Sequence, residues 1–108
     1  MTDLVVILVT TASAEEAERI GKALVEERLA ACANLVPGIR SFFFWEGRLN
    51  DEGEALLILK SKATLLPKIE ARVKELHSYQ VPEVIALPIL SGSAQYLKWV
   101  EEELGGTL

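Results

Sequence analysis

Cys32, His77 and Glu83 are the side chains in this sequence whose chemistry could hold a metal ion. Cys32 lies in the apolar stretch Leu29-Ala30-Ala31-Cys32-Ala33-Asn34, where a small buried side chain is the ordinary outcome. Its thiolate would also suit a soft ion such as Cu(I), or act as a nucleophile beside a base. The residue type therefore leaves a packing role and a chemical role open.

His77 is the single histidine of the chain and stands at the expected end of a helix. An imidazolium there would be stabilised by the negative end of the helix dipole. The alternative is an imidazole that binds a divalent cation such as Cu(II). Because one histidine cannot complete a metal site, that alternative needs Glu83, Cys32 or groups from another subunit.

The remaining motifs give no support to an enzyme. Trp45, Tyr79, Tyr96 and Trp99 are expected to pack in the core or in an interface. The sequence lacks the signatures of serine hydrolases, zinc peptidases, P-loop proteins and dinucleotide-binding proteins. We therefore expect a protein without enzymatic activity and without an organic cofactor.

Composition limits the partners of the 108-residue chain. Sixteen acidic against eleven basic residues give a net charge of -5, which disfavours nucleic acid and anionic membranes. No apolar stretch approaches the roughly 20 residues that span a bilayer, and the start Met1-Thr2-Asp3 lacks the basic region of a signal peptide. A single cysteine excludes an intrachain disulfide. We expect a cytoplasmic protein.

Apolar spacing predicts four strands and three helices. The strands are expected over residues 4–9, 34–45, 54–61 and 83–87, and the helices over 13–28, 64–77 and 93–104. Ser13 and Glu16 form a capping box, whereas Thr64 and Ser93 are predicted to cap the later helices. Segment 47–53 is predicted to be a hairpin connection, and Gly105-Gly106 to stop the last helix.

The order βαββαβ plus a C-terminal helix is typical of the ferredoxin-like split βαβ sandwich, an α+β fold with helices on one face of an antiparallel sheet. We expect residues 1–108 to form one such domain. The strands over 4–9 and 54–61 are apolar on both faces, and each such side chain left in water forfeits about 1.5–3 kcal/mol. Copies of the chain are expected to cover the second face, and a dimer and a trimer fit equally well.

Several separated motifs together resemble the CutA divalent-cation-tolerance family. They are Leu29-Ala30-Ala31-Cys32-Ala33-Asn34, then Pro37, Ile39, Ser41 and Trp45-Glu46-Gly47, then Glu54 and Lys60, then His77, Tyr79, Pro82 and Glu83, and finally Tyr96, Leu97 and Trp99. The resemblance covers nearly the whole chain. It implies a cytoplasmic homotrimer of ferredoxin-like subunits, a role in tolerance to metals such as copper, and structural kinship with the PII-type signalling proteins.

The resemblance also places the shared polar positions toward clefts between subunits: Cys32, Trp45, Lys60, His77, Tyr79 and Glu83. Some members are thought to bind copper through a cysteine in the first strand, where this chain has none. The leading hypothesis is a non-enzymatic trimer that binds divalent cations through His77 with Glu83 or Cys32. The alternatives are a PII-like sensor that holds an anionic metabolite through Lys60, and a scaffold for another protein.

Overall fold

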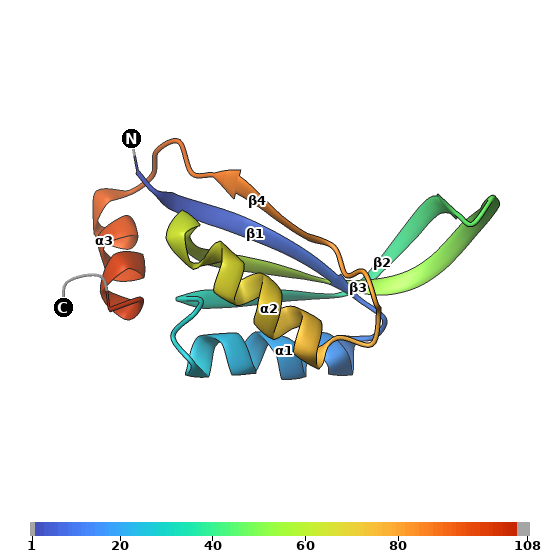
Figure 1. Ribbon diagram of the computed structural model, residues 1–108. Helices are drawn as coiled ribbons and strands as arrows, with labels where there is room; N and C mark the ends of the chain where they lie inside the picture. Colours follow the sequence, from blue (N-terminus) through green and yellow to red (C-terminus); the bar gives the residue numbers. More distant parts are fainter. Residues whose placement is uncertain (1, 106–108) are drawn as a thin grey trace.

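The structure is a computed structural model that describes residues 2–105. Its elements follow in the order β1 (Leu4–Thr11), α1 (Ala14–Glu26), β2 (Cys32–Trp45), β3 (Arg48–Lys62), η1 (Ala63–Leu65), α2 (Leu66–Leu76), β4 (Val84–Pro88) and α3 (Ala94–Glu103). The strands form one sheet in the order β2-β3-β1-β4, and every neighbouring pair is antiparallel. Helices α1 and α2 lie together on one side of it (Figure 1). The predicted α+β, ferredoxin-like split βαβ architecture is therefore confirmed.

The core lies between the sheet and helices α1 and α2. Alternate residues of β1 and β3, such as Ile7 and Leu57, are fully buried there against Ile20 and Ile69 of the two helices. A Cβ at Gly21 would lie 3.1 Å from Cδ2 of Leu57, so α1 approaches β3 closely. Each large aliphatic side chain buried in this layer stabilises the fold by about 1.5–3 kcal/mol.

The other face of the sheet is largely apolar and is left uncovered by α1 and α2, whereas α3 covers only its end, at Leu4. The register pairs Val6 with Leu87, and Leu8 with both Ile58 and Ile85. The same face also carries Leu56 and the polar residues Thr10 and Lys60. Ile85 and Leu87 remain 48% and 49% exposed. The apolar character that the sequence showed on both faces of the strands thus leaves an uncovered apolar face, which we call the open face.

Helix α3 packs at one end of the sheet (Figure 1). Val100 and Leu104 form a small second core there with Leu4 and Ala31. Arg28 also pairs with Glu103 at 2.7 Å, which ties the end of α1 to the end of α3. Gly105 has a φ of +71°, as expected of a helix stop, whereas Gly106 lies outside the described residues. Within residues 2–105 no helix has the length and apolarity needed to cross a membrane.

Two of the three predicted helix caps are present. Ser13 accepts a hydrogen bond from the N–H of Glu16, and Ser93 accepts one from the N–H of Tyr96. The prediction for Thr64 is wrong, because this residue lies inside η1 and α2 begins without a side-chain cap. A turn of 3-10 helix supplies the geometry that the cap would have set.

A hairpin joins β2 to β3 as predicted, but the predicted bounds of its connection, 47–53, are wrong. The strands β2 and β3 stay paired up to Trp45 and Arg48, and the turn is only Glu46 and Gly47, both with positive φ. Asp51 is held in the ladder by a bidentate ion pair with Arg40, at 2.8 and 2.9 Å. The paired segments 39–45 and 48–54, which we call the arm, project beyond the sheet (Figure 1).

Candidate functional site

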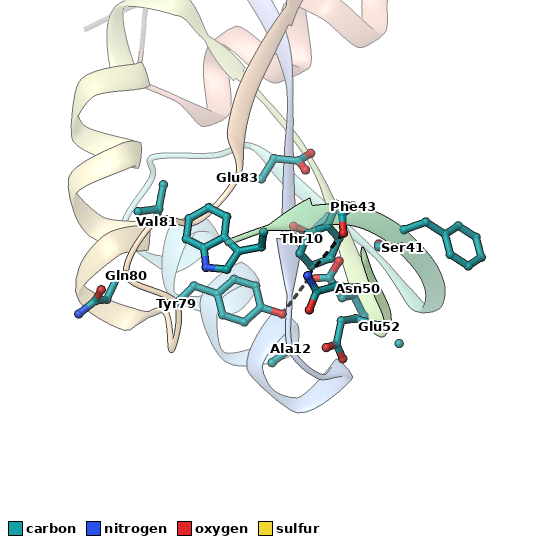
Figure 2. Close-up of a pocket in the computed structure, with 14 residues that line it drawn as sticks. Thr10, Ala12, Ser41, Phe43, Asn50, Glu52, Tyr79, Gln80, Val81 and Glu83 are labelled. Atoms are coloured by element: carbon teal, nitrogen blue, oxygen red, sulfur yellow. Dashed lines mark hydrogen bonds between the residues drawn. The ribbon is translucent and has the colours of Figure 1, made fainter. Parts of the chain in front are cut away.

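A cavity of about 940 Å³ lies between the arm and the loop that follows α2. Its walls come from the end of β1, from both strands of the arm and from residues 79–83. In Figure 2, Tyr79 reaches across the cavity toward Asn50 and Glu52, with Glu83 above it. The register of β2 with β3 fixes the arm, and the end of α2 fixes the loop, so the fold brings these segments together.

Three carboxylates line this cavity: Glu52, Glu54 and Glu83. Glu54 is 8% exposed, whereas Glu52 and Glu83 are exposed. The hydroxyl of Tyr79 donates a 2.8 Å hydrogen bond to Oε2 of Glu54. Burial, and then the neighbouring Glu54 carboxylate, raise the pKa of Tyr79 well above its usual value, so its hydroxyl keeps its proton.

Aromatic rings form the apolar part of the cavity. Phe43 and Trp45 come from β2 and are 40% and 57% exposed, and Tyr79 comes from the facing loop. Trp45, which was expected to pack in a core or an interface, therefore lies outside the core of this chain. Aromatic faces beside carboxylates are suited to positively charged ligands.

His77, two residues before Tyr79, does not line the cavity, and its side chain is fully buried. Its Nδ1 accepts a 3.0 Å hydrogen bond from the N–H of Tyr79, so Nε2 carries the proton and donates to the carbonyl oxygen of Thr10 at 2.7 Å. Its ring also packs on that of Tyr79, with centroids 4.7 Å apart. Both ring nitrogens are therefore engaged with the protein, and the imidazole fixes the position of Tyr79.

Glu16 supports the same loop from the start of α1. Its carboxylate accepts hydrogen bonds from the N–H of Ala12 at 3.0 Å and from the N–H of Ser78 at 2.9 Å. Burial raises the pKa of Glu16, but the hydrogen bonds from Ala12 and Ser78 outweigh it, and the pKa falls below its ordinary value. An ionised Glu16 thus joins α1 to the loop that lines the cavity.

Cys32 and Lys60 lie at the other end of the sheet. They face each other across β2 and β3, and Nζ of Lys60 donates to Oδ1 of Asn34. Cys32 is only half-buried, and its thiol lies 3.7 Å from the same oxygen. Burial and the nearby Cys32 thiol raise the pKa of Tyr96 on α3.

The fold separates the six predicted site residues into two groups. Trp45, Tyr79 and Glu83 line the cavity, with His77 directly behind Tyr79. Lys60 pairs with Val6, four residues before Thr10 on β1, so Cys32 and Lys60 lie about 13 Å from His77 along the strand. No three acidic, histidine or cysteine residues in the part of the chain that the structure describes are grouped to hold a metal ion. A complete cation site would need ligands from a second copy or from water.

Neither Glu52 nor Glu54 was predicted from the sequence to be a site residue. Glu54 was part of a family motif but was not assigned to a site, and its burial beside Tyr79 follows from a contact between residues 25 positions apart. Nothing in the sequence marked Glu52 as a site residue, because it lies in the segment predicted to be a hairpin connection. Correct pairing of the arm would have placed it on a strand close to Glu54.

Comparison with known proteins agrees with this architecture. Residues 5–103 match the family model described as CutA1 divalent ion tolerance protein. The divalent-cation tolerance protein CutA of Thermus thermophilus is 50% identical over 100 residues, which are 93% of this chain and 97% of that protein. Human protein CutA is 42% identical over 94 residues, 87% of this chain but 52% of the human protein, so the chain spans about half of that relative.

Solved structures give the same result. The Thermus thermophilus Cut A1 structure superposes with a TM-score of 0.90 at 49% identity, and the match covers 93% of this chain and 97% of that one. CutA from Xylella fastidiosa superposes with a TM-score of 0.92 at 35% identity, and the match covers 95% of this chain and 99% of that one. The chain therefore belongs to the CutA1 divalent ion tolerance family.

Proposed function

We propose that this protein is a cytoplasmic homotrimer that binds copper or a similar divalent cation, without enzymatic activity, and so contributes to metal tolerance. Membership of a family described by divalent ion tolerance supports the general role. A single cysteine, half-buried and free, fits a reducing compartment. The names of relatives differ on location, since one from rice is called chloroplastic and a structure from Archaeoglobus fulgidus is titled periplasmic. Cell fractionation of the native host tests this part.

The open face supports the oligomer. Ile85 and Leu87 are about half exposed in the single chain, and they lie beside Leu8 and Val6 on the same face. Covering apolar side chains of this kind is the main favourable term in subunit association. Three copies, the number that the family resemblance implies, would bury this face in a closed ring. Sedimentation velocity is expected to give the mass of three chains, and a monomer at micromolar concentration would contradict the proposal.

The proposal of cation binding rests on the carboxylates that line the cavity. Glu52, Glu54 and Glu83 line one cavity, and none of them has an ion pair among the described residues. Glu83 is exposed, as is Glu52, so an ion can reach it from solvent. His77 would become a ligand only by releasing the N–H of Tyr79 from Nδ1, and Cys32 only through another subunit.

Calorimetric titration with Cu(II) and Zn(II) tests the ligand assignment. Glu83→Gln is expected to weaken binding about tenfold, because it removes one charged ligand. His77→Gln and Cys32→Ser measure the contributions of the other two proposed ligands. Glu102→Gln removes the same charge from an exposed position on α3, away from the cavity, and is the control. Binding curves that coincide for wild type, Glu83→Gln, His77→Gln and Cys32→Ser would refute the proposed site.

A small-molecule sensor is the second candidate function, and the size of the cavity favours it. A volume of about 940 Å³ lies within the usual range of ligand pockets, about 300–1,000 Å³. A sensor of anions would have to use Lys60 instead, which lies at the other end of the sheet and donates to Asn34. Thermal unfolding in the presence of a metabolite panel tests this candidate, and a constant melting temperature across the panel would count against it.

A further inference from the structure

We propose that the cavity between the arm and the loop 79–83 binds an organic ammonium group, a protonated amine carried on an apolar chain. This cavity is the one to which the proposed function assigns a cation. The ammonium group rests on that assignment and names the class of ligand. It does not require a metal ion.

The negative charge of the cavity has no counter-ion among residues 2–105 of a single chain. Acidic residues elsewhere pair with arginine, as Glu27 does with Arg72 and Glu103 with Arg28. Among residues 2–105, no lysine, arginine or histidine lines the cavity, and its three glutamates form no ion pair. This arrangement attracts a cation and repels phosphates and carboxylates.

Glu54 is less exposed to water than the carboxylates of a typical surface cluster. The residue as a whole is 8% exposed, and its Oε2 accepts a hydrogen bond from the hydroxyl of Tyr79. Within the described part of the chain, Oε1 has no donor. Oε1 is not a fully buried atom and so remains accessible where Glu54 lines the cavity. An ammonium group there could donate a charge-assisted hydrogen bond to it.

The apolar walls favour an organic cation over a bare ion. Phe43, Trp45, Tyr79 and Val81 line the same space as the glutamates. Aromatic faces attract an ammonium group by cation–π interaction, and they cover an alkyl chain, whereas they offer nothing to a metal ion. The volume of about 940 Å³ exceeds the needs of a single ion and suits a small amine.

Pentylamine is the probe, because it joins an ammonium group to a short apolar chain, and pentanol is its uncharged counterpart. The protein is kept in excess chelator so that metal ions play no part. The chain has two tryptophans, and Trp99→Phe leaves Trp45 as the reporter within the cavity. We expect a saturable change of tryptophan fluorescence with pentylamine and none with pentanol. Trp45→Phe, which keeps only Trp99 on α3, is expected to give no change.

Charge-neutral variants locate the binding. Glu52→Gln and Glu83→Gln are each expected to weaken pentylamine binding about tenfold, because each removes a charged acceptor. Glu102→Gln, which removes a charge from α3, is expected to bind like the wild type. Equal binding of pentanol and pentylamine, or unchanged binding by both cavity variants, would overturn the inference.

The ammonium group could be supplied by a free amine or by a lysine side chain of another protein. Nα-acetyl-lysine amide distinguishes these sources: tighter binding than pentylamine assigns the cavity to lysine, and weaker binding assigns it to free amines. Both results require the glutamates. Titration with Cu(II) in the absence of chelator reports on metal binding alone, so failure of the metal proposal leaves the amine result intact, and the reverse also holds.

Discussion

The hydroxyl of Tyr79 donates a 2.8 Å hydrogen bond to Oε2 of Glu54, and this bond joins the loop after α2 to the base of the arm. Tyr79→Phe removes the donor and leaves the buried carboxylate without it. The free energy of unfolding is expected to fall by about 1–3 kcal/mol, the usual cost of a buried polar group that loses its partner. Equilibrium unfolding in urea measures this change.

Tyr96→Phe is the matched control for that experiment. Tyr96 is 42% exposed on α3, so water can replace any partner of its hydroxyl. Its loss is expected to change the free energy of unfolding by less than about 0.5 kcal/mol. Glu54→Gln keeps an acceptor for Tyr79 and should cost less than Tyr79→Phe. Equal effects of Tyr79→Phe and Tyr96→Phe would show that the bond to Glu54 adds nothing to stability.

The carboxylate of Glu16 predicts how stability depends on pH. Its folded pKa is lowered because the N–H groups of Ala12 and Ser78 outweigh the effect of burial. Glu16 therefore adds stability above its ordinary value of 4.5, and this contribution disappears as the pH falls through the lower folded pKa. Glu16→Gln is expected to lower the free energy of unfolding at neutral pH and to flatten its decline in acid. Urea midpoints measured as a function of pH provide the test.

Glu15→Gln separates this effect from a general change of charge. Glu15 is the neighbouring residue in the first turn of α1, and its side chain is more exposed than that of Glu16. The pH dependence of its urea midpoint is expected to match that of the wild type. If Glu15→Gln flattened the acid decline as much as Glu16→Gln, the hydrogen bonds of Glu16 would not be its cause.

Local sequence patterns predicted most of the fold. Ser13 and Ser93 could be recognised because a cap and its helix are adjacent in the sequence, and the apolar faces followed from strand and helix periodicity. The prediction of a loop over 47–53 was wrong for a physical reason. Asn50, Asp51 and two glycines favour a loop, but pairing with β2 and the Arg40 ion pair keep the segment in a strand. Tertiary contacts overrode local preference.

The candidate site was less accessible to sequence reasoning. The sequence placed His77 at the end of a helix, and it is indeed the C-cap of α2. Its hydrogen bond to Thr10 spans 67 residues, which no local pattern encodes, whereas its contact with Tyr79 is two residues away in the sequence. Cys32 was expected to be small and buried but is half-buried, on the sheet face opposite α1 and α2 and near Tyr96 of α3.

The turn of the arm offers a test of backbone conformation. Glu46 and Gly47 both have positive φ, at 51° and 76°, as a two-residue hairpin turn requires. A residue other than glycine in this conformation costs about 1–2 kcal/mol, so Gly47→Ala is expected to lower the free energy of unfolding by that amount. Glu46→Asn is expected to raise it slightly, because asparagine tolerates this region better. Urea unfolding measures both variants.

Gly38→Ala is the control for the turn. Gly38 lies in the irregular part of β2 and has no positive φ, and a methyl group added at its Cα would meet nothing within 4 Å. Its substitution is expected to leave the free energy of unfolding unchanged or slightly raised, because alanine restricts the unfolded chain. A loss for Gly38→Ala as large as that for Gly47→Ala would mean that the side chain and not the backbone angle matters.

If subunits associate through the open face, one charged side chain introduced there is expected to dissociate them. Ile85 is 48% exposed in the single chain, so Ile85→Glu places a carboxylate where water can still reach it and should leave the subunit folded. In an assembly that buries this face, the same carboxylate would be desolvated without a partner. Sedimentation velocity is therefore expected to shift from the mass of three chains toward that of one, with an unchanged circular dichroism spectrum.

Leu90→Glu shows whether that effect belongs to the open face. Leu90 is 80% exposed and lies in the segment between β4 and α3, outside the strands that form the face. The same change of charge and size at this position is expected to leave the sedimentation coefficient as it is in the wild type. If Ile85→Glu sedimented like Leu90→Glu and both matched the wild type, subunits would associate through another surface, and the trimer would have to be assigned to the arm instead.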